Sequence, residues 1–333
     1  MKAMDEAQSG PNAAKPFPAA QATHPDRPAL AVALMVGSLC LLALQDSLVK
    51  LASSEVSLWQ FQVVRSSCNA VLLLLVLRLV WSGGTIRPRR LWAVSLRSLC
   101  HVGAMVFFFG GVPFLNLSDI AAGLYVFPLF VVLLSALFLG EAVGPRRIGA
   151  ALAGLAGTLL ILKPGTASFQ WVGLMPVFAA FWYALTILIT RKLCREESPA
   201  ALNFALALAF MALGVLGLGA ASLWAPPELA ASWPYLFTGW RELAPGVLAL
   251  ILVCSGLNLT AGLGLAKAYQ SAESSWLVPF DYSYLIFATF WGAVMWAHWP
   301  DAWSFLGMGL IASAGCYVAW RERAVSRARP TRV

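Results

Sequence analysis

The feature that most constrains this chain is a near-continuous series of apolar runs from Leu30 to Trp320, broken only by short polar joints. A helix needs about 20 apolar residues to cross the hydrocarbon core of a bilayer. The series is long enough for ten such helices, and its runs are continuous, whereas membrane β-strands alternate between apolar and polar residues. We therefore expect an all-α integral membrane protein with ten transmembrane helices, over residues 30–51, 58–79, 92–114, 119–140, 147–165, 171–190, 200–223, 244–266, 274–297 and 302–320.

The composition indicates lipid rather than water as the surroundings of most of the chain. Hydrophobic residues make up 60% of the 333 positions and charged residues 11%, against about 45–50% and about a quarter in soluble domains. The excess apolar side chains must face something other than water, which excludes an ordinary soluble enzyme, a disulfide scaffold and a disordered chain. The six cysteines are scattered without a Cys-x-x-Cys spacing, so we expect buried thiols and no metal centre.

The basic residues gather on one side of the expected spans. With the amino terminus inside, the inner segments contain 18 lysines and arginines, and the outer segments contain only Lys50, Lys163 and Arg241. Cytoplasmic loops carry such an excess, so we expect two cytoplasmic tails, 1–29 and 321–333, on a protein of the cell inner membrane. Because the net charge of +8 lies in loops and tails, no nucleic-acid partner is expected. The long outer joint, 224–243, is expected to lie along the interface rather than to plug a pore.

The two halves of the series resemble each other weakly. A shift of 142 residues places Lys50 on Lys192, and a shift of 157 places Glu141 on His298. Lys50 falls outside and Lys192 inside, as an inverted repeat of five helices plus five requires. We therefore expect one repeat over 30–165 and a second over 171–320. Inverted repeats are typical of secondary transporters, whose solute site lies near the midplane between the halves.

Several motifs in both halves resemble a known family. The stretch from Ala121 to Phe130, followed by Leu139-Gly140-Glu141, resembles the first-repeat motif of EamA-type transporters in the drug/metabolite transporter superfamily. Three further features are similar to that family, namely Asp46 to Lys50 with Arg65, Pro279-Phe280-Asp281-Tyr282, and Gly307 with Ile311. The chain departs from the family at Ala297-His298, where Gly-Glu is usual.

The resemblance implies a ten-helix solute carrier without ATP hydrolysis or a cofactor, with a central cavity and alternating access. Members of the family move amino acids, riboflavin, S-adenosylmethionine and other metabolites, so the resemblance leaves the solute open. Asp46, Lys50 and Arg65 look most like the riboflavin and S-adenosylmethionine branches.

Charged residues inside expected spans are candidate functional residues, because a charge at the bilayer centre costs about 2.5–3.5 kcal/mol on insertion scales. Asp46 and Lys50 share one face of the first span, and Arg65 lies at a similar depth of the second. They form either an ion-pair triad that fixes helix packing, or a gate or solute contact. A second set at one depth, on spans from both halves, is Arg97, His101 and Asp281. We expect this set to face a cavity for a polar or zwitterionic solute, with His101 making it sensitive to pH.

Aromatic residues and prolines complete the candidate site. Trp182, Tyr183, Tyr282 and Tyr284 lie at apparent mid-depth, where they either line a cavity for a flat solute or pack against other helices. Pro128 and Pro279 are expected to break helix hydrogen bonds and to expose carbonyl groups at the cavity wall. At the inner face, Glu141 is expected to pair with Arg146 or Arg147.

The sequence thus predicts a secondary-active transporter of a small organic metabolite of the amino-acid, flavin or nucleoside type, coupled to a proton or to an exchanged solute. A membrane-embedded lipid-modifying enzyme is the first alternative, but His24, His101 and His298 are far apart and no catalytic motif is present. A membrane scaffold that transports nothing is the second, and it would not explain the repeat.

Overall fold

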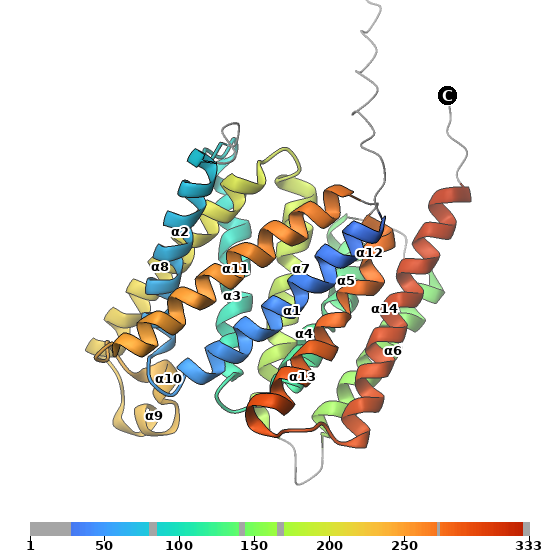
Figure 1. Cartoon of the computed structure of the whole chain (residues 1–333). Helices are drawn as coiled ribbons and strands as arrows, with labels where there is room; N and C mark the ends of the chain where they lie inside the picture. The colour runs from blue at the N-terminus through green and yellow to red at the C-terminus, as the bar shows by residue number, and fades with distance from the viewer. Residues whose placement is uncertain (1–27, 80–84, 140–143, 165–169, 272–273, 329–333) are drawn as a thin grey trace, which may run out of the picture.

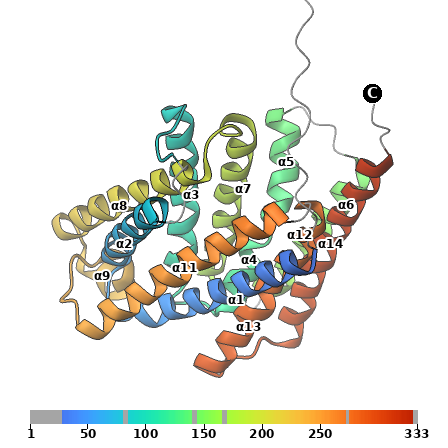
Figure 2. The same cartoon turned by 45° about the horizontal axis from the view of Figure 1, so that its top comes forward.

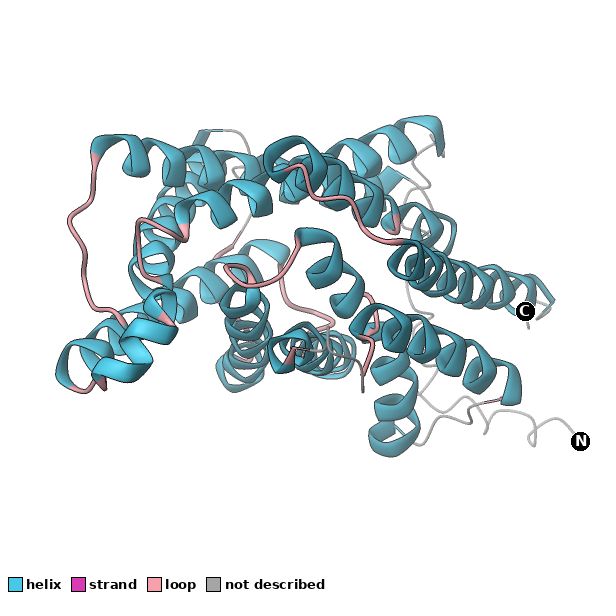
Figure 3. Cartoon of the chain, turned by 90° about the horizontal axis from the view of Figure 1, so that it is seen from below, coloured by secondary structure: helices cyan, strands magenta, loops and turns pink. Residues whose placement is uncertain are grey.

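The computed structural model describes residues 28–79, 85–139, 144–164, 170–271 and 274–328, and the regular structure in these ranges is entirely helical (Figure 3). Seven helical stretches are long and apolar enough to cross a membrane. They cover Ala29–Ala52, Leu58–Leu79, Leu91–Gly111, Leu117–Phe138, Trp171–Leu193, Pro199–Leu223 and Pro245–Leu265. The chain is therefore a multi-pass membrane protein. The expected pairing of Glu141 lies outside the described residues.

The helices follow the expected runs closely along the chain. Their bounds are α1 (Pro28–Ala52), α2 (Leu58–Leu79), α3 (Leu91–Gly111), α4 (Leu117–Leu124), α5 (Phe127–Leu139), α6 (Pro145–Leu162), η1 (Trp171–Leu174), α7 (Met175–Leu193), α8 (Pro199–Leu223), α9 (Pro227–Ser232), α10 (Pro234–Phe237), α11 (Pro245–Ser271), α12 (Ser274–Asp281), α13 (Ser283–Trp296) and α14 (Ala302–Ala328). The apolar parts of α6 and α14 are shorter, at Ile148–Leu162 and Ala302–Val318. Ten spans therefore stay a prediction.

Two of the expected spans are broken helices. The run expected at 119–140 divides into α4 and α5, with Tyr125 and Val126 between them, and the run at 274–297 divides into α12 and α13 at Tyr282. Tyr282 follows Tyr125 by 157 positions, the shift at which the two halves resemble each other. Pro128 accounts for the first break, because its ring lacks an N–H and clashes with the carbonyl of Leu124, four residues earlier. Pro279 lies inside α12 and the second break follows it.

The strongest helix contacts pair the first half of the chain with the second. Helix α1 packs along α11, α3 along α7, α2 along α8, and α6 along α14. The pair α2 and α8 lies at one edge of the bundle, and α6 with α14 lies at the other (Figures 1 and 2). The start of α1 and the end of α14 lie at one end of the bundle, which we call the terminal end, and α9 and α10 lie at the opposite end (Figure 1).

The contact between α6 and α14 depends on two glycines. A Cβ atom added to Gly157 would lie 2.6 Å from the carbonyl oxygen of Gly307 and 3.0 Å from Cγ1 of Ile311. We expect Gly157→Ala to lower the free energy of unfolding by about 1–3 kcal/mol, because α14 must move to admit the methyl group. Gly154 is a matched control on α6, since nothing lies within 4 Å of its added Cβ. Thermal unfolding in detergent should separate the two variants, and equal melting temperatures would contradict this packing.

The joint at 224–243, whose place along the interface stays a prediction, packs partly against the bundle. Trp224 and Trp240 are exposed, as expected, but Tyr235 is only 2% exposed and packs inside the bundle among Phe61, Phe109 and Ile251. The segment is also hydrogen-bonded to α2. Trp59 donates to the carbonyl of Leu236 (2.7 Å), and the Gln60 amide both donates to and accepts from the main chain of Arg241 (2.8 and 3.0 Å). The segment therefore closes this end of the bundle.

Candidate functional site

A cavity of about 400 Å³ lies between the helices of the two halves. Its walls come from α1, α2, α3, α8 and α11, from the start of α13, and from residues beside both helix breaks. From Asp46 and Asp281 it extends to Leu77 near the end of α2 and Pro199 at the start of α8, which lie toward the terminal end. Small-molecule sites usually have volumes of about 300–1,000 Å³, so the cavity has the size of a metabolite site.

A ladder of polar side chains crosses one wall of the cavity. Asp46 on α1 accepts hydrogen bonds from the Tyr284 hydroxyl (2.5 Å) and from the Gln45 amide (2.8 Å). The Oε1 atom of Gln45 accepts from Nδ2 of Asn258 on α11 (2.8 Å), and Asn258 accepts a longer hydrogen bond from Asn69 on α2 (3.4 Å). The ladder joins four helices, so the Asp46 carboxylate has a fixed position.

Arg65 supplies the positive charge of the cavity. Its side chain donates to Oε1 of Gln62 (2.9 Å), and its guanidinium lies 5.1–5.8 Å from the ring centres of Phe61, Phe109 and Phe210. Contacts of this length are favourable cation–π interactions. The guanidinium also interacts electrostatically with the Asp46 carboxylate, although the two form no direct ion pair. Asp46 and Arg65 therefore balance each other's charge across the cavity.

Aromatic rings beside the helix breaks form a further part of the wall, which meets the ladder at Tyr284. Tyr125 stacks on Tyr284 with ring centres 5.8 Å apart and an interplanar angle of 18°. Phe127 meets Tyr183 edge to face at 5.1 Å, and Tyr183 meets His101 at 5.8 Å. Flat apolar faces with polar tips suit a solute that has an aromatic ring system and polar substituents.

The second helix break exposes a main-chain carbonyl that a residue from the first break binds. The Leu285 N–H bonds to the carbonyl of Tyr282, three residues earlier, so it does not bond to Asp281 as in a regular α-helix. The carbonyl of Asp281 instead accepts a hydrogen bond from the Tyr125 hydroxyl (2.9 Å). The two breaks are thus joined directly.

Several polar atoms around the cavity have no protein partner. Among the described residues, buried polar atoms without a hydrogen bond include Nε of Arg65, Oδ1 of Asn69 and Nδ1 of His101. Each of these residues lines the cavity. Because an unpaired buried polar group costs about 1–3 kcal/mol, these three atoms mark polar groups that the packing beside the cavity leaves unpaired in this state.

The structure brings together six of the residues expected from the sequence and leaves six outside. The cavity is lined by Asp46, Arg65, His101, Tyr183, Asp281 and Tyr284. Outside it are Lys50, Arg97, Trp182, Tyr282, Pro128 and Pro279. Trp182 packs on Gly103 of α3, and the Tyr282 ring lies against Gly315 of α14. Pro128 lines a second cavity of about 40 Å³, and Pro279 is half-buried in α12.

Both expected charge clusters divide in the structure. Lys50 does not meet Asp46, because its ammonium donates to the carbonyl of Leu115 (2.6 Å) and lies 5.2 Å from the Trp296 ring centre. Arg97 does not pair with Asp281, because it bonds to the Thr190 hydroxyl and the Leu202 carbonyl (3.3 and 3.4 Å). Each cationic side chain instead reaches another segment, which is the joint between α3 and α4 for Lys50 and helices α7 and α8 for Arg97.

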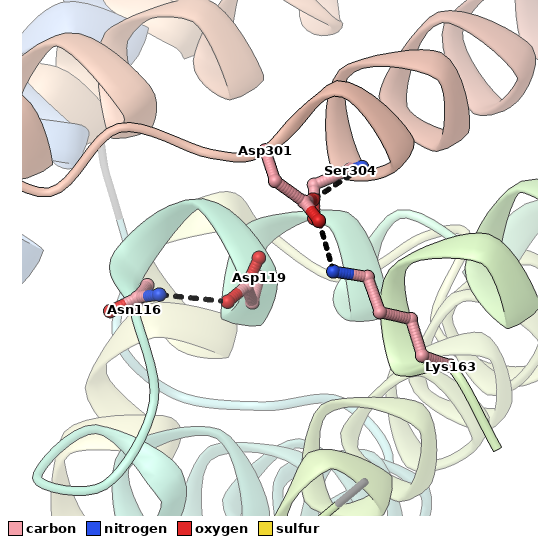
Figure 4. A network of polar contacts seen from close by, with 5 residues as sticks. All are labelled: Asn116, Asp119, Lys163, Asp301 and Ser304. Atoms are coloured by element: carbon pink, nitrogen blue, oxygen red, sulfur yellow. Dashed lines mark hydrogen bonds and ion pairs between the residues drawn. The ribbon is translucent and has the colours of Figure 1, made fainter. Parts of the chain in front are cut away.

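A polar network joins both halves at the end of the bundle opposite the terminal end (Figure 4). Lys163, just after α6, pairs with Asp301, whose other oxygen accepts from the Ser304 N–H (2.9 Å) at the start of α14. The hydrogen bond from Lys163, supported by Ser304, lowers the pKa of Asp301 to about 2. Nearby on α4, Asn116 donates to Asp119 (3.1 Å). The network lies outside the cavity, so we assign it a structural part.

Sequence patterns did not single out several residues of the site. Gln45, Asn69, Asn258 and Phe210 carry no charge and belong to no motif that we recognised. The internal repeat could have indicated Tyr125 as a site residue, because the shift of 157 residues that relates the two halves places it on Tyr282. The amides of the ladder gave no such signal, since their hydrogen-bond partners are on helices far apart in sequence.

A helical bundle around a polar, aromatic-lined cavity defines a multi-pass membrane protein with an internal small-molecule site. Residues 29–163 match the model of the EamA-like transporter family. This match confirms the resemblance to EamA-type transporters in the sequence.

Two relatives and one solved structure extend the comparison. The riboflavin transporter of Rhizobium johnstonii is 31% identical over 195 residues, which are 59% of this chain and 59% of that relative. The chain therefore spans about three fifths of the riboflavin transporter's length. The pseudopaline exporter CntI of Pseudomonas aeruginosa is 25% identical over 289 residues, 84% of this chain and 92% of the exporter. A crystal structure of another protein, 18% identical, aligns with a TM-score of 0.58 over 90% of this chain and 99% of that one, so the two share a fold.

Proposed function

We propose that this protein is a secondary-active transporter of a flat, polar organic metabolite, and that riboflavin or a related flavin is its solute. The observation that carries the proposal is the cavity itself, which combines stacked tyrosines with the polar ladder through Asp46. A flavin has a broad ring system for the tyrosines and many polar groups for the amides. The name of the riboflavin relative from Rhizobium johnstonii supports the same solute.

We also propose ten membrane-spanning helices in two inverted repeats, 30–165 and 171–320. The helix contacts support this division. In this division α1, α2 and α3 of the first repeat correspond to α7, α8 and α11 of the second. When each helix is replaced by its counterpart, the contact between α1 and α11 becomes the contact between α7 and α3, which is also one of the main contacts. The same exchange leaves the pairs α2–α8 and α6–α14 unchanged. The two helix breaks also exchange.

The position of the cavity supports alternating access. It extends toward the terminal end, while a buried cluster that includes Phe61, Phe109 and Tyr235 lies between it and the α9–α10 end. In the proposed orientation the terminal end is cytoplasmic, so the structure corresponds to an inward-facing state of a carrier in the cell inner membrane. The solute then leaves or enters on the outside only after Tyr235 and its neighbours have moved.

Thiol labelling tests the orientation. In a variant without the native cysteines, we expect an impermeant thiol reagent added to intact cells to label Trp240→Cys, because Trp240 is 57% exposed in the outer segment. Arg87→Cys, in the exposed joint before α3, should react only after the cells are opened. The opposite pattern would reverse the topology. A cysteine at position 235 of the same outer segment would not serve as a labelling site, because Tyr235 is buried and the reagent would not reach it.

Uptake of riboflavin into proteoliposomes tests the function, with two glycines of α11 as a matched pair. An added Cβ meets nothing within 4 Å at Gly262 or at Gly256, but only Gly262 lines the cavity. We expect Gly262→Phe to reduce uptake at least tenfold by filling the cavity, and Gly256→Phe to retain it. Wild-type protein without riboflavin uptake would rule out this solute, and equal uptake by the two variants would rule out the cavity as its path.

A further inference from the structure

The Asp281 carboxylate is the one acidic group lining the cavity that has no partner among the described residues. It lies at the end of α12, where the helix breaks, and it lines the cavity. No hydrogen bond or ion pair to its side chain occurs in the described part of the chain, although its main-chain carbonyl is bound by Tyr125. Its oxygens are not among the fully buried unpaired polar atoms of the described residues, and the residue lines the cavity.

Among the described residues, the groups near Asp281 on neighbouring helices supply no positive charge to balance it. The phenols of Tyr125 just after α4, Tyr183 on α7 and Tyr282 beside the second break are near its carboxylate. Beyond them lie His101 on α3, which contacts Tyr183, and Asp46 on α1, whose charge Arg65 already balances. On α14, Cys316 adjoins Tyr282. Arg97 is separated from the cavity and bound to α7 and α8.

The two acidic residues of the cavity are therefore held differently. Both Asp46 oxygens accept hydrogen bonds, and Arg65 interacts with the group electrostatically, so the Asp46 carboxyl group is held in place. An unpaired carboxylate within the membrane costs several kcal/mol, and at Asp281 only something that enters the cavity can offset that cost. A neutral solute such as a flavin brings no cation, whereas water in the cavity can bring a proton.

We propose that Asp281 is the proton-binding residue that couples solute movement to the proton gradient, an inference that rests on the proposed transport function. Binding converts the carboxylate to the neutral acid, which removes the charge from the cavity and leaves an O–H donor beside the tyrosines. The neutral acid can move with the carrier as it changes between its inward-facing and outward-facing states, and the carboxylate is restored when the proton leaves on the other side. Because Asp281 is at the helix break, its protonation state acts on the segment that joins the two halves through Tyr125.

The first test measures riboflavin uptake into proteoliposomes with and without an imposed pH gradient, and takes the ratio of the two rates. The ratio is independent of how much activity a variant retains. For the wild type we expect a ratio that differs from one by at least threefold. For Asp281→Asn we expect a ratio of one, and for Asp281→Glu, which keeps a titratable group, a ratio that again differs from one. Asp301→Asn, outside the cavity, is the control and should keep the wild-type ratio. A ratio of one for the wild type, or a wild-type ratio for Asp281→Asn, overturns the proposal.

A second test needs no solute and so separates a failure of this inference from a failure of the proposed function. Infrared difference spectra, recorded as the pH is lowered, should show the carbonyl stretch of a protonated carboxylic acid in the wild type. We expect that band to be missing in Asp281→Asn and shifted in Asp281→Glu, with melting temperatures confirming that each variant is folded. An unchanged band in Asp281→Asn assigns the proton to another residue and overturns the proposal, even if riboflavin is transported.

Discussion

Replacing Arg65 with glutamine is expected to abolish solute uptake and to lower the free energy of unfolding by about 3–5 kcal/mol, the usual cost of removing one partner of a buried charge pair. Arg65 is 5% exposed and Asp46 8% exposed, so the Asp46 charge would be left unbalanced away from bulk water. Three aromatic rings would also lose their cation. Thermal unfolding in detergent and proteoliposome uptake measure the two effects.

A double-mutant comparison separates charge balance from simple loss of packing. Adding Asp46→Asn to Arg65→Gln should recover part of the lost stability, because the unbalanced charge is then gone. Lys50 provides the matched comparison, since it is four residues from Asp46 on the same helix but binds Leu115 instead. We expect Asp46→Asn and Lys50→Gln to be additive. Additivity of Asp46→Asn with Arg65→Gln as well would mean that the cavity contains no coupled charge pair.

Replacing Tyr125 with alanine is expected to have a comparable effect, about 3–5 kcal/mol by analogy with other large aromatic residues in protein cores. Tyr125 stacks on Tyr284, lies 5.3 Å from the Tyr282 ring centre, and is the hydrogen-bond donor to the freed carbonyl of Asp281. Its loss would leave a gap between the two helix breaks and an unpaired carbonyl at the cavity wall. We therefore expect a large drop in melting temperature together with loss of uptake.

Phenylalanine variants isolate the hydroxyl groups. Tyr125→Phe keeps the ring stack but removes the hydrogen bond, so we expect a loss of about 1–3 kcal/mol from the unpaired carbonyl. Tyr282 is its counterpart at the other break, and its hydroxyl makes no hydrogen bond among the described residues. Tyr282→Phe should therefore be close to wild type in melting temperature. If the two variants melt alike, the bond between Tyr125 and Asp281 does not join the breaks.

The sequence alone was enough to predict the helical membrane fold and most of its helix positions. Runs of about 20 apolar residues cannot be hidden from water in a chain of this size, and lipid requires the backbone to satisfy its own hydrogen bonds as helices. It was also enough to select charged residues inside the spans as site candidates, because insertion cost is a property of each residue by itself. Asp46, Arg65 and Asp281 were found in this way, and all three line the cavity.

Only the tertiary structure decided which partners these residues have. A shared face of the first span suggested that Lys50 would join Asp46, and equal depth suggested that Arg97 would join Asp281. Neither feature specifies where the end of a long side chain lies. The segments packed beside each helix decided this, with the Leu115 carbonyl binding Lys50 and with Thr190 and Leu202 binding Arg97. The same packing brought the uncharged Gln45, Asn69 and Asn258 together. Uncharged residues do not have the large membrane-insertion cost that distinguished the charged candidates in the sequence. Composition and periodicity thus determined the bundle, while the long-range contacts between its halves determined the site.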